Sequence, residues 1–111
     1  MDRKLKTLLY DIKEHIILVE TFIGTSKMYK LYIDDIQLQY SVERCLGIIG
    51  EATNNLIKLQ PDIAITNARK IVNLRNMLAH EYFRKEPENI WSVIINHLPT
   101  LKIEVEKLLN E

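Results

Sequence analysis

The chain contains little of several residue types that define common classes of protein. Among its 111 residues are one cysteine, three histidines, three glycines and three prolines. Cys45 alone cannot form an intrachain disulfide, and so few histidines do not supply the paired ligands of a zinc motif. No apolar run reaches the roughly eighteen residues that a membrane-spanning helix needs. We therefore expect a cytoplasmic protein with no disulfide, no zinc motif and no contact with a membrane.

What remains is the composition of a folded, globular domain. Apolar residues make up 47% and charged residues 27% of the chain, with fifteen side chains of each sign, which is ordinary for such domains. A chain of this size buries about two-thirds of its surface on folding, enough for one core. No segment alternates with period two for long enough to predict a sheet. We predict a single all-helical domain spanning residues 1–111.

The few glycines and prolines divide the chain into four long segments, and each shows helical periodicity. Gly24 ends the first, the second runs from about Ile33 to Leu59, and Pro61 suits the first turn of a third helix reaching the neighbourhood of Tyr82. Pro99 lies inside the last pattern and predicts a kink and not a stop. The apolar stripes are formed by Leu5, Leu9, Ile12, Ile16, Val19 and Ile23, by Leu38, Val42, Cys45, Leu46, Ile49, Ala52, Leu56 and Leu59, and by Trp91, Ile94, Leu98, Leu101, Val105 and Leu108. We predict an up-down four-helix bundle whose last helix is kinked by proline.

Arg75 occupies an unusual position on the third predicted helix. On a wheel of about 100° per residue it falls near 40° from Ile71, on the apolar stripe. A guanidinium there must meet a carboxylate, reach water past the edge of the core, or line a ligand or subunit cleft. Residues 64–85 carry five positive and one negative side chain, so a contact with a polyanion is also an option.

Glu51 is the candidate acid for Arg75. It lies in the run Gly50-Glu51-Ala52, whose small neighbours would let another helix approach closely. A structural Arg75–Glu51 pair is therefore an alternative to a functional role for Arg75.

His80 follows Arg75 by five residues, about 140° around a helix, so one continuous helix does not turn both side chains toward one small ligand. The helix could unwind near His80, or the side chains could bend toward a shared groove. Two copies could instead face each other across a twofold axis and bring two arginines and two histidines into one cleft.

The run Arg75-Asn76-Met77-Leu78-Ala79-His80-Glu81-Tyr82 resembles the Arg-x-x-x-x-His-x-Tyr motif of the HepT-like toxins, which belong to the HEPN superfamily of helical proteins. The resemblance covers nearly the whole chain. It departs upstream of the motif, at residues 68–74, where many relatives have a tryptophan and a glycine. The other residues that resemble the family in order and spacing are Gly50-Glu51-Ala52, Pro61, Phe83, Trp91 and Leu98-Pro99.

This resemblance implies a HEPN-like fold and a homodimeric, metal-independent endoribonuclease that acts as a toxin. His80 and Arg75 fit the catalytic roles, and no cofactor is required because RNA carries its own nucleophile. Asn76, whose side-chain amide could orient His80 or the phosphate, and Glu51, the candidate acid for Arg75, are assigned supporting roles. The implied partner is a nucleotidyltransferase antitoxin that transfers AMP to Tyr82. Two alternatives stay open, a non-catalytic helical partner or substrate-binding subunit of a nucleotidyltransferase, and a dimerising bundle in which Arg75 is structural.

Overall fold

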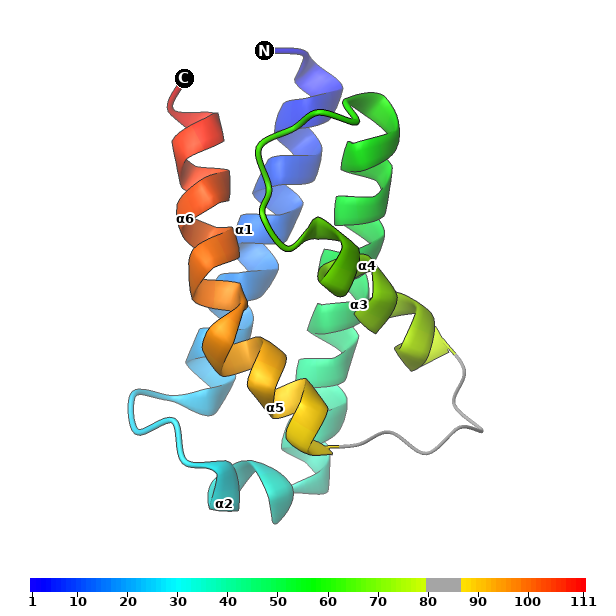
Figure 1. Ribbon diagram of the computed structural model, residues 1–111. Helices are drawn as coiled ribbons and strands as arrows, with labels where there is room; N and C mark the ends of the chain where they lie inside the picture. The colour runs from blue at the N-terminus through cyan, green and yellow to red at the C-terminus, as the bar shows by residue number, and fades with distance from the viewer. Residues whose placement is uncertain (80–86) are drawn as a thin grey trace.

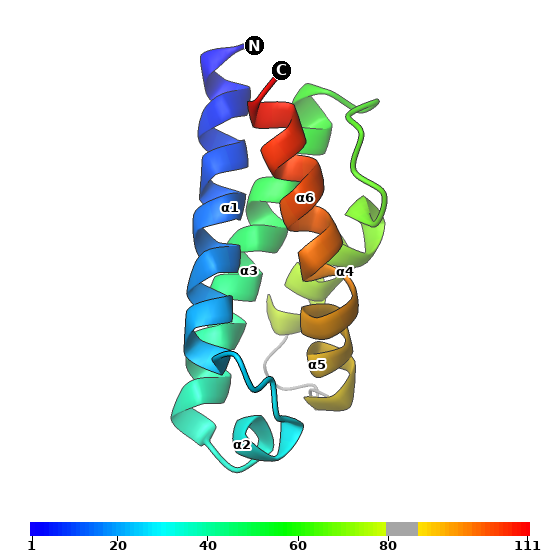
Figure 2. The ribbon, with the colours of Figure 1, turned by 90° about the vertical axis from the view of Figure 1, so that its left-hand side faces the viewer.

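The computed structural model describes residues 1–79 and 87–111, and within them every regular element is a helix. Three helices lie roughly side by side along the length of the molecule, namely α1 (Arg3–Ile23), α3 (Ile36–Leu59) and α6 (Leu98–Leu109) (Figures 1 and 2). The short helix α2 (Tyr29–Ile33) lies at the end opposite to the chain termini. The prediction of an all-helical fold is confirmed. No described helix is both long enough and apolar enough to cross a membrane.

Local sequence signals explain where the two longest helices begin and end. Asp2 and Asp35 precede α1 and α3, and their carboxylates accept hydrogen bonds from backbone N–H groups of the first turns, as N-cap residues do. Gly24 has a φ of 80° and ends α1, because a residue without a Cβ takes this left-handed conformation at no steric penalty. The predicted end of the first helix is thus confirmed.

The predicted apolar stripes form the core. Leu9, Ile12, Ile16 and Val19 of α1 are fully buried, and so is Leu46 of α3. The end of the second stripe differs from the prediction, since Leu59 is 45% exposed. α1 packs against both α3 and α6, whereas α4 (Ala68–Ala79) packs chiefly against α3.

The segment that contains Pro61 differs from the prediction. Pro61 lies in a turn, and α4 begins only at Ala68. The backbone N–H of Thr66 donates to both carboxylate oxygens of Glu104 on α6 at 3.1 Å, and the Thr66 hydroxyl donates to the same carboxylate. Ile65 is buried beside this anchor. These long-range contacts hold the segment as a loop, although proline is compatible with a first helical turn.

The helices are also interrupted near Ile33, where the second helix was predicted to begin, and near Pro99. Residues 29–35 form α2 and a bend before α3, so the second segment does not start as one helix near Ile33. At the other end α5 (Pro87–Asn96) stops and α6 starts after the single residue His97. The ring of Pro99 has no N–H and crowds the carbonyl four residues earlier, and the chain bends between α5 and α6, where the kink was predicted (Figure 1). The end of the third predicted helix, near Tyr82, lies outside the described residues.

Candidate functional site on helices α3 and α4

The predicted site residues of α3 and α4 meet where these two helices come closest, a region we call the α3–α4 seam and define by Gly50, Glu51, Ile71, Arg75 and Asn76. Gly50 lies directly under α4. A Cβ built on it would lie 3.0 Å from the carbonyl oxygen of Ile71 and 3.2 Å from Cα of Arg75, and it would overlap Cβ of Arg75. Only glycine permits this approach, so the close approach expected from the small residues around Glu51 is confirmed.

Glu51, the next residue on α3, receives the guanidinium of Arg75. Nε of Arg75 lies 2.6 Å from Oε2 of Glu51. The Arg75 side chain is 34% exposed and that of Glu51 is 50% exposed, so the ion pair lies at the protein surface with one side open to water. Glu51 therefore supplies a carboxylate partner for the arginine on the apolar stripe.

Asn76 also contacts the guanidinium. Nη1 of Arg75 donates to Oδ1 of Asn76 at 2.9 Å. Glu51 and Asn76 thus hold different nitrogens of the same planar group, which limits its rotation. Three of the five predicted site residues therefore meet within the described structure. His80 and Tyr82, the other two, lie outside the described residues.

Comparison with known proteins identifies the family. The model of the family described as "Ribonuclease HepT-like" matches residues 12–108. The chain belongs to this family. A Thermococcus cleftensis protein named "Probable ribonuclease HepT" is 34% identical over 112 residues, which cover 97% of this chain and 98% of that protein. A Methanocaldococcus jannaschii protein whose name proposes an RNase is 33% identical over 108 residues, covering 94% of this chain and 95% of that protein. No solved structure shows significant similarity to the chain.

A feature of this HepT-like chain that the sequence reasoning missed is an aromatic cluster of Tyr29, Tyr32 and Trp91. The ring centroids of Trp91 lie 5.6 Å from Tyr29 and 5.4 Å from Tyr32. Tyr32 is 1% exposed, and among the described residues its hydroxyl has no hydrogen-bond partner. Burial, with smaller contributions from Glu43 and Tyr29, raises the pKa of Tyr32, so its hydroxyl stays protonated. The cluster joins α2 to α5 and is an apolar contact between these helices.

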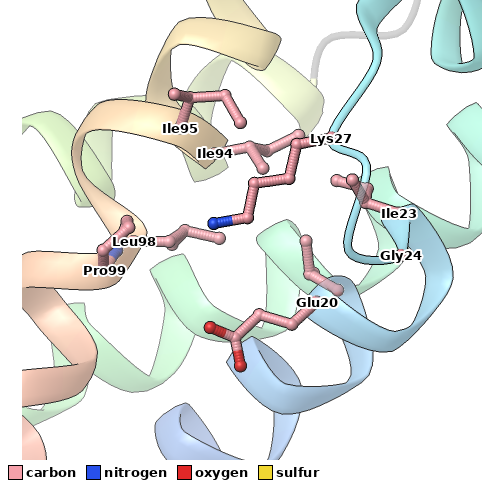
Figure 3. Close-up of a pocket in the computed structure, with 9 residues that line it drawn as sticks. Glu20, Ile23, Gly24, Lys27, Ile94, Ile95, Leu98 and Pro99 are labelled. Carbon is pink, nitrogen blue, oxygen red and sulfur yellow. The ribbon is translucent and has the colours of Figure 1, made fainter.

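A pocket of this HepT-like chain lies away from the predicted site residues, between the end of α1 and the junction of α5 and α6 (Figure 3). It is lined mainly by aliphatic side chains, and the side chain of Lys27 extends across it. Glu20 at its edge accepts a hydrogen bond from Lys102 at 2.9 Å. Glu51, Arg75 and Asn76, the predicted site residues that the structure describes, do not line this pocket.

Proposed function

We propose that this chain is an endoribonuclease toxin that cleaves RNA without a metal ion, acts as a homodimer, and is neutralised when a nucleotidyltransferase antitoxin transfers AMP to Tyr82. Family membership supports ribonuclease activity. The observation that carries the proposal for the site is Arg75, whose guanidinium contacts Glu51 and Asn76 among the described residues while its side chain stays 34% exposed. His80 follows it by five residues in the sequence.

RNA cleavage requires little from the protein because RNA carries its own nucleophile. The 2′-oxygen loses its proton and attacks phosphorus, the bond from phosphorus to the 5′-oxygen breaks, and that oxygen takes up a proton. The products are a 2′,3′-cyclic phosphate and a free 5′-hydroxyl. An imidazole can give up or take up a proton near neutral pH, and in this scheme His80 serves as the general base or acid.

Arg75 stabilises the additional negative charge on the phosphate. A guanidinium matches phosphate oxygens through charge-assisted hydrogen bonds, and it does so best when its orientation is fixed in advance. Glu51 at Nε and Asn76 at Nη1 supply this orientation. Because Glu51 occupies the Nε side of the planar group, we expect the phosphate to approach its Nη nitrogens.

The competing interpretation is that Arg75 serves only the stability of the fold. An ion pair that is 34% and 50% exposed contributes about 0–1 kcal/mol. That is too little to require an arginine on an apolar stripe, so the magnitude favours a functional role. The structural interpretation predicts that Arg75→Ala lowers the melting temperature sharply, and we expect a small decrease instead.

A homodimer would bring the Arg75 and His80 of two chains together in one cleft. AMP on Tyr82, two residues after His80, would add a charge of about −1 and a bulky base near the phosphate site. Both repulsion and occlusion would then prevent RNA from binding, which is the proposed mechanism of neutralisation.

The central experiment measures cleavage of end-labelled RNA by the purified protein in EDTA. We expect wild type to yield 2′,3′-cyclic phosphate ends, and His80→Ala and Arg75→Ala to yield none while keeping the wild-type circular dichroism spectrum and sedimentation coefficient. His15→Ala is the matched control, since His15 lies on α1 and its ring nitrogen contacts the carbonyl oxygen of Asp11. Cleavage by folded His80→Ala, or RNA binding by wild type without cleavage, would refute the proposal.

The proposed modification needs its own experiment. The protein is incubated with ATP and a nucleotidyltransferase from a HepT-like toxin–antitoxin pair, and the intact mass is measured. We expect one or more AMP groups on wild type and on Tyr40→Phe, a control at a tyrosine that is 67% exposed, but none on Tyr82→Phe. AMP transfer to Tyr82→Phe would place the modification elsewhere.

A further inference from the structure

We infer that Gly50 is a positioning residue for RNA cleavage, because it sets the distance between α4 and α3 at which Arg75 meets Glu51. This inference rests on the proposed function. Gly50 itself offers no side chain to RNA. Its effect would pass through the backbone of α4 to the guanidinium.

The contacts of Gly50 explain why no other residue fits. A Cβ at this position would overlap Cβ of Arg75 and would crowd Cα of Arg75 and the carbonyl oxygen of Ile71. None of these three atoms can rotate away, since two belong to the backbone and the third is the first atom of its side chain. Ordinary carbon–carbon contacts lie at about 3.5–4.0 Å, so α4 would have to move outward by about 1 Å.

Such a movement would act directly on the Arg75–Glu51 pair. The contact is only 2.6 Å long, and Glu51 is the residue next to Gly50, so α4 would move away from the point where Glu51 is attached. A misplacement of about 1 Å in a catalytic group can lower a rate by about 100-fold. The pair is thus placed by the close approach of two backbones and not by a flexible contact between long side chains.

Gly47 is a matched control on the same helix. It precedes Gly50 by three residues, and a Cβ built on it meets no described atom within 4 Å. Alanine at either position has the same intrinsic preference for helix over glycine. The two substitutions therefore differ in the contact with α4.

The experiment compares Gly50→Ala with Gly47→Ala by two measurements, the single-turnover rate of RNA cleavage and the nuclear magnetic resonance signal of the Arg75 Nε–H group. The signal of the Arg75 Nε–H group is the one that disappears in Arg75→Lys. The position of this signal in Glu51→Gln marks the state in which the ion pair is lost. We expect Gly50→Ala to slow cleavage by about 10- to 100-fold and to move the signal toward its position in Glu51→Gln. Gly47→Ala should change neither. Sedimentation of each variant checks that the oligomeric state is preserved.

Two results would overturn the inference. In one, Gly50→Ala cleaves RNA as fast as Gly47→Ala. In the other, Gly50→Ala slows cleavage while the Nε–H signal stays at its wild-type position. If wild type itself does not cleave RNA, the proposed function fails, and the Nε–H signal still decides whether Gly50 places Arg75. If Gly50→Ala alone does not fold, the substitution is made together with Gly47→Ala, which adds helix stability without the contact, and both measurements are repeated.

Discussion

α3 is packed in two different ways on two of its sides. Toward the bundle it contributes fully buried aliphatic side chains such as Val42 and Leu46 to a core shared with α1 and α6. Toward α4 it presents Gly50 and the half-exposed Glu51. The first side keeps helices together by filling the space between them, and the second brings two backbones close enough to fix a charged group at the surface.

This difference separates the residues that stabilise the fold from those that would serve chemistry. Burial of a large aliphatic side chain contributes about 1.5–3 kcal/mol, whereas an exposed ion pair contributes about 0–1 kcal/mol. Substitutions in the core should therefore affect stability, and substitutions in the α3–α4 seam should affect cleavage. Four predictions test this separation.

The largest effect is expected in the core. Leu46→Ala removes a side chain with 0% exposure and should lower the free energy of unfolding by about 2–5 kcal/mol, because the cavity adds to the lost burial. Urea denaturation measures it. Leu59→Ala, on the same helix at a residue that is 45% exposed, is the control and should change little. Equal losses in both variants would contradict the assignment of the core.

A smaller effect is expected where the segment before α4 is anchored to α6. Glu104→Gln weakens the hydrogen bonds from Thr66 and should lower the free energy of unfolding by about 1–2 kcal/mol, since bonds to a charged acceptor are stronger than neutral ones. Glu106→Gln is the control, because Glu106 lies 3.7 Å from Lys13 in an exposed pair. If both variants unfold at the same urea concentration, Glu104 does not anchor the segment.

Two surface ion pairs provide the sharpest comparison. Arg75–Glu51 in the seam and Lys102–Glu20 between α6 and α1 are similarly exposed, at 34% and 50% against 29% and 42%. Double-mutant cycles should give each pair a coupling energy of about 0–1 kcal/mol. Loss of Arg75 alone should abolish cleavage, while Lys102→Met should cleave RNA normally. If Arg75→Ala still cleaves RNA, or if Lys102→Met does not, the functional difference between the two ion pairs is refuted.

The smallest effect is a dependence of stability on pH. The hydrogen bond with Glu20, opposed by desolvation and aided by the charges of Glu20 and Glu106, raises the pKa of Lys102 above its ordinary 10.5. A raised pKa means that folding favours the ammonium form, so this contribution is fully present below pH 10.5 and is lost as the pH rises through the folded-state pKa. We compare the free energies of unfolding of wild type and Glu20→Gln. The advantage of wild type should be about 1 kcal/mol or less below pH 10.5 and should decrease as the pH rises further. A difference that grows with pH would refute this.

Much of the fold could be predicted because its causes are local. The apolar periodicity of α1 and its end at Gly24 depend on neighbours within a few residues. The loop around Thr66 could not be predicted, because its anchor, Glu104, is 38 residues away in the sequence. The residues of the loop are themselves compatible with a helical turn. α2, with five residues, is too short for its periodicity to show.

The sequence proposes the members of the candidate site, but it does not predict their geometry. Motif spacing and resemblance named Arg75, and the small neighbours of Glu51 indicated a close helix there. Whether the guanidinium reaches that carboxylate depends on how α4 crosses α3. This crossing is set by the packing of both helices and cannot be read from the sequence of either one. The sequence left the Arg75–Glu51 pair as one of several options, and the structure forms it.

The packing of α4 against chiefly one neighbour has a consequence for motion. A helix held on two sides opens only when much of the domain unfolds, but a helix held on one side can detach at a lower free energy. The amide protons of α4 should therefore exchange earlier than those of α1, which packs against both α3 and α6. Any ligand that bridges α3 and α4 would stabilise α4 in its packed position and would slow that exchange.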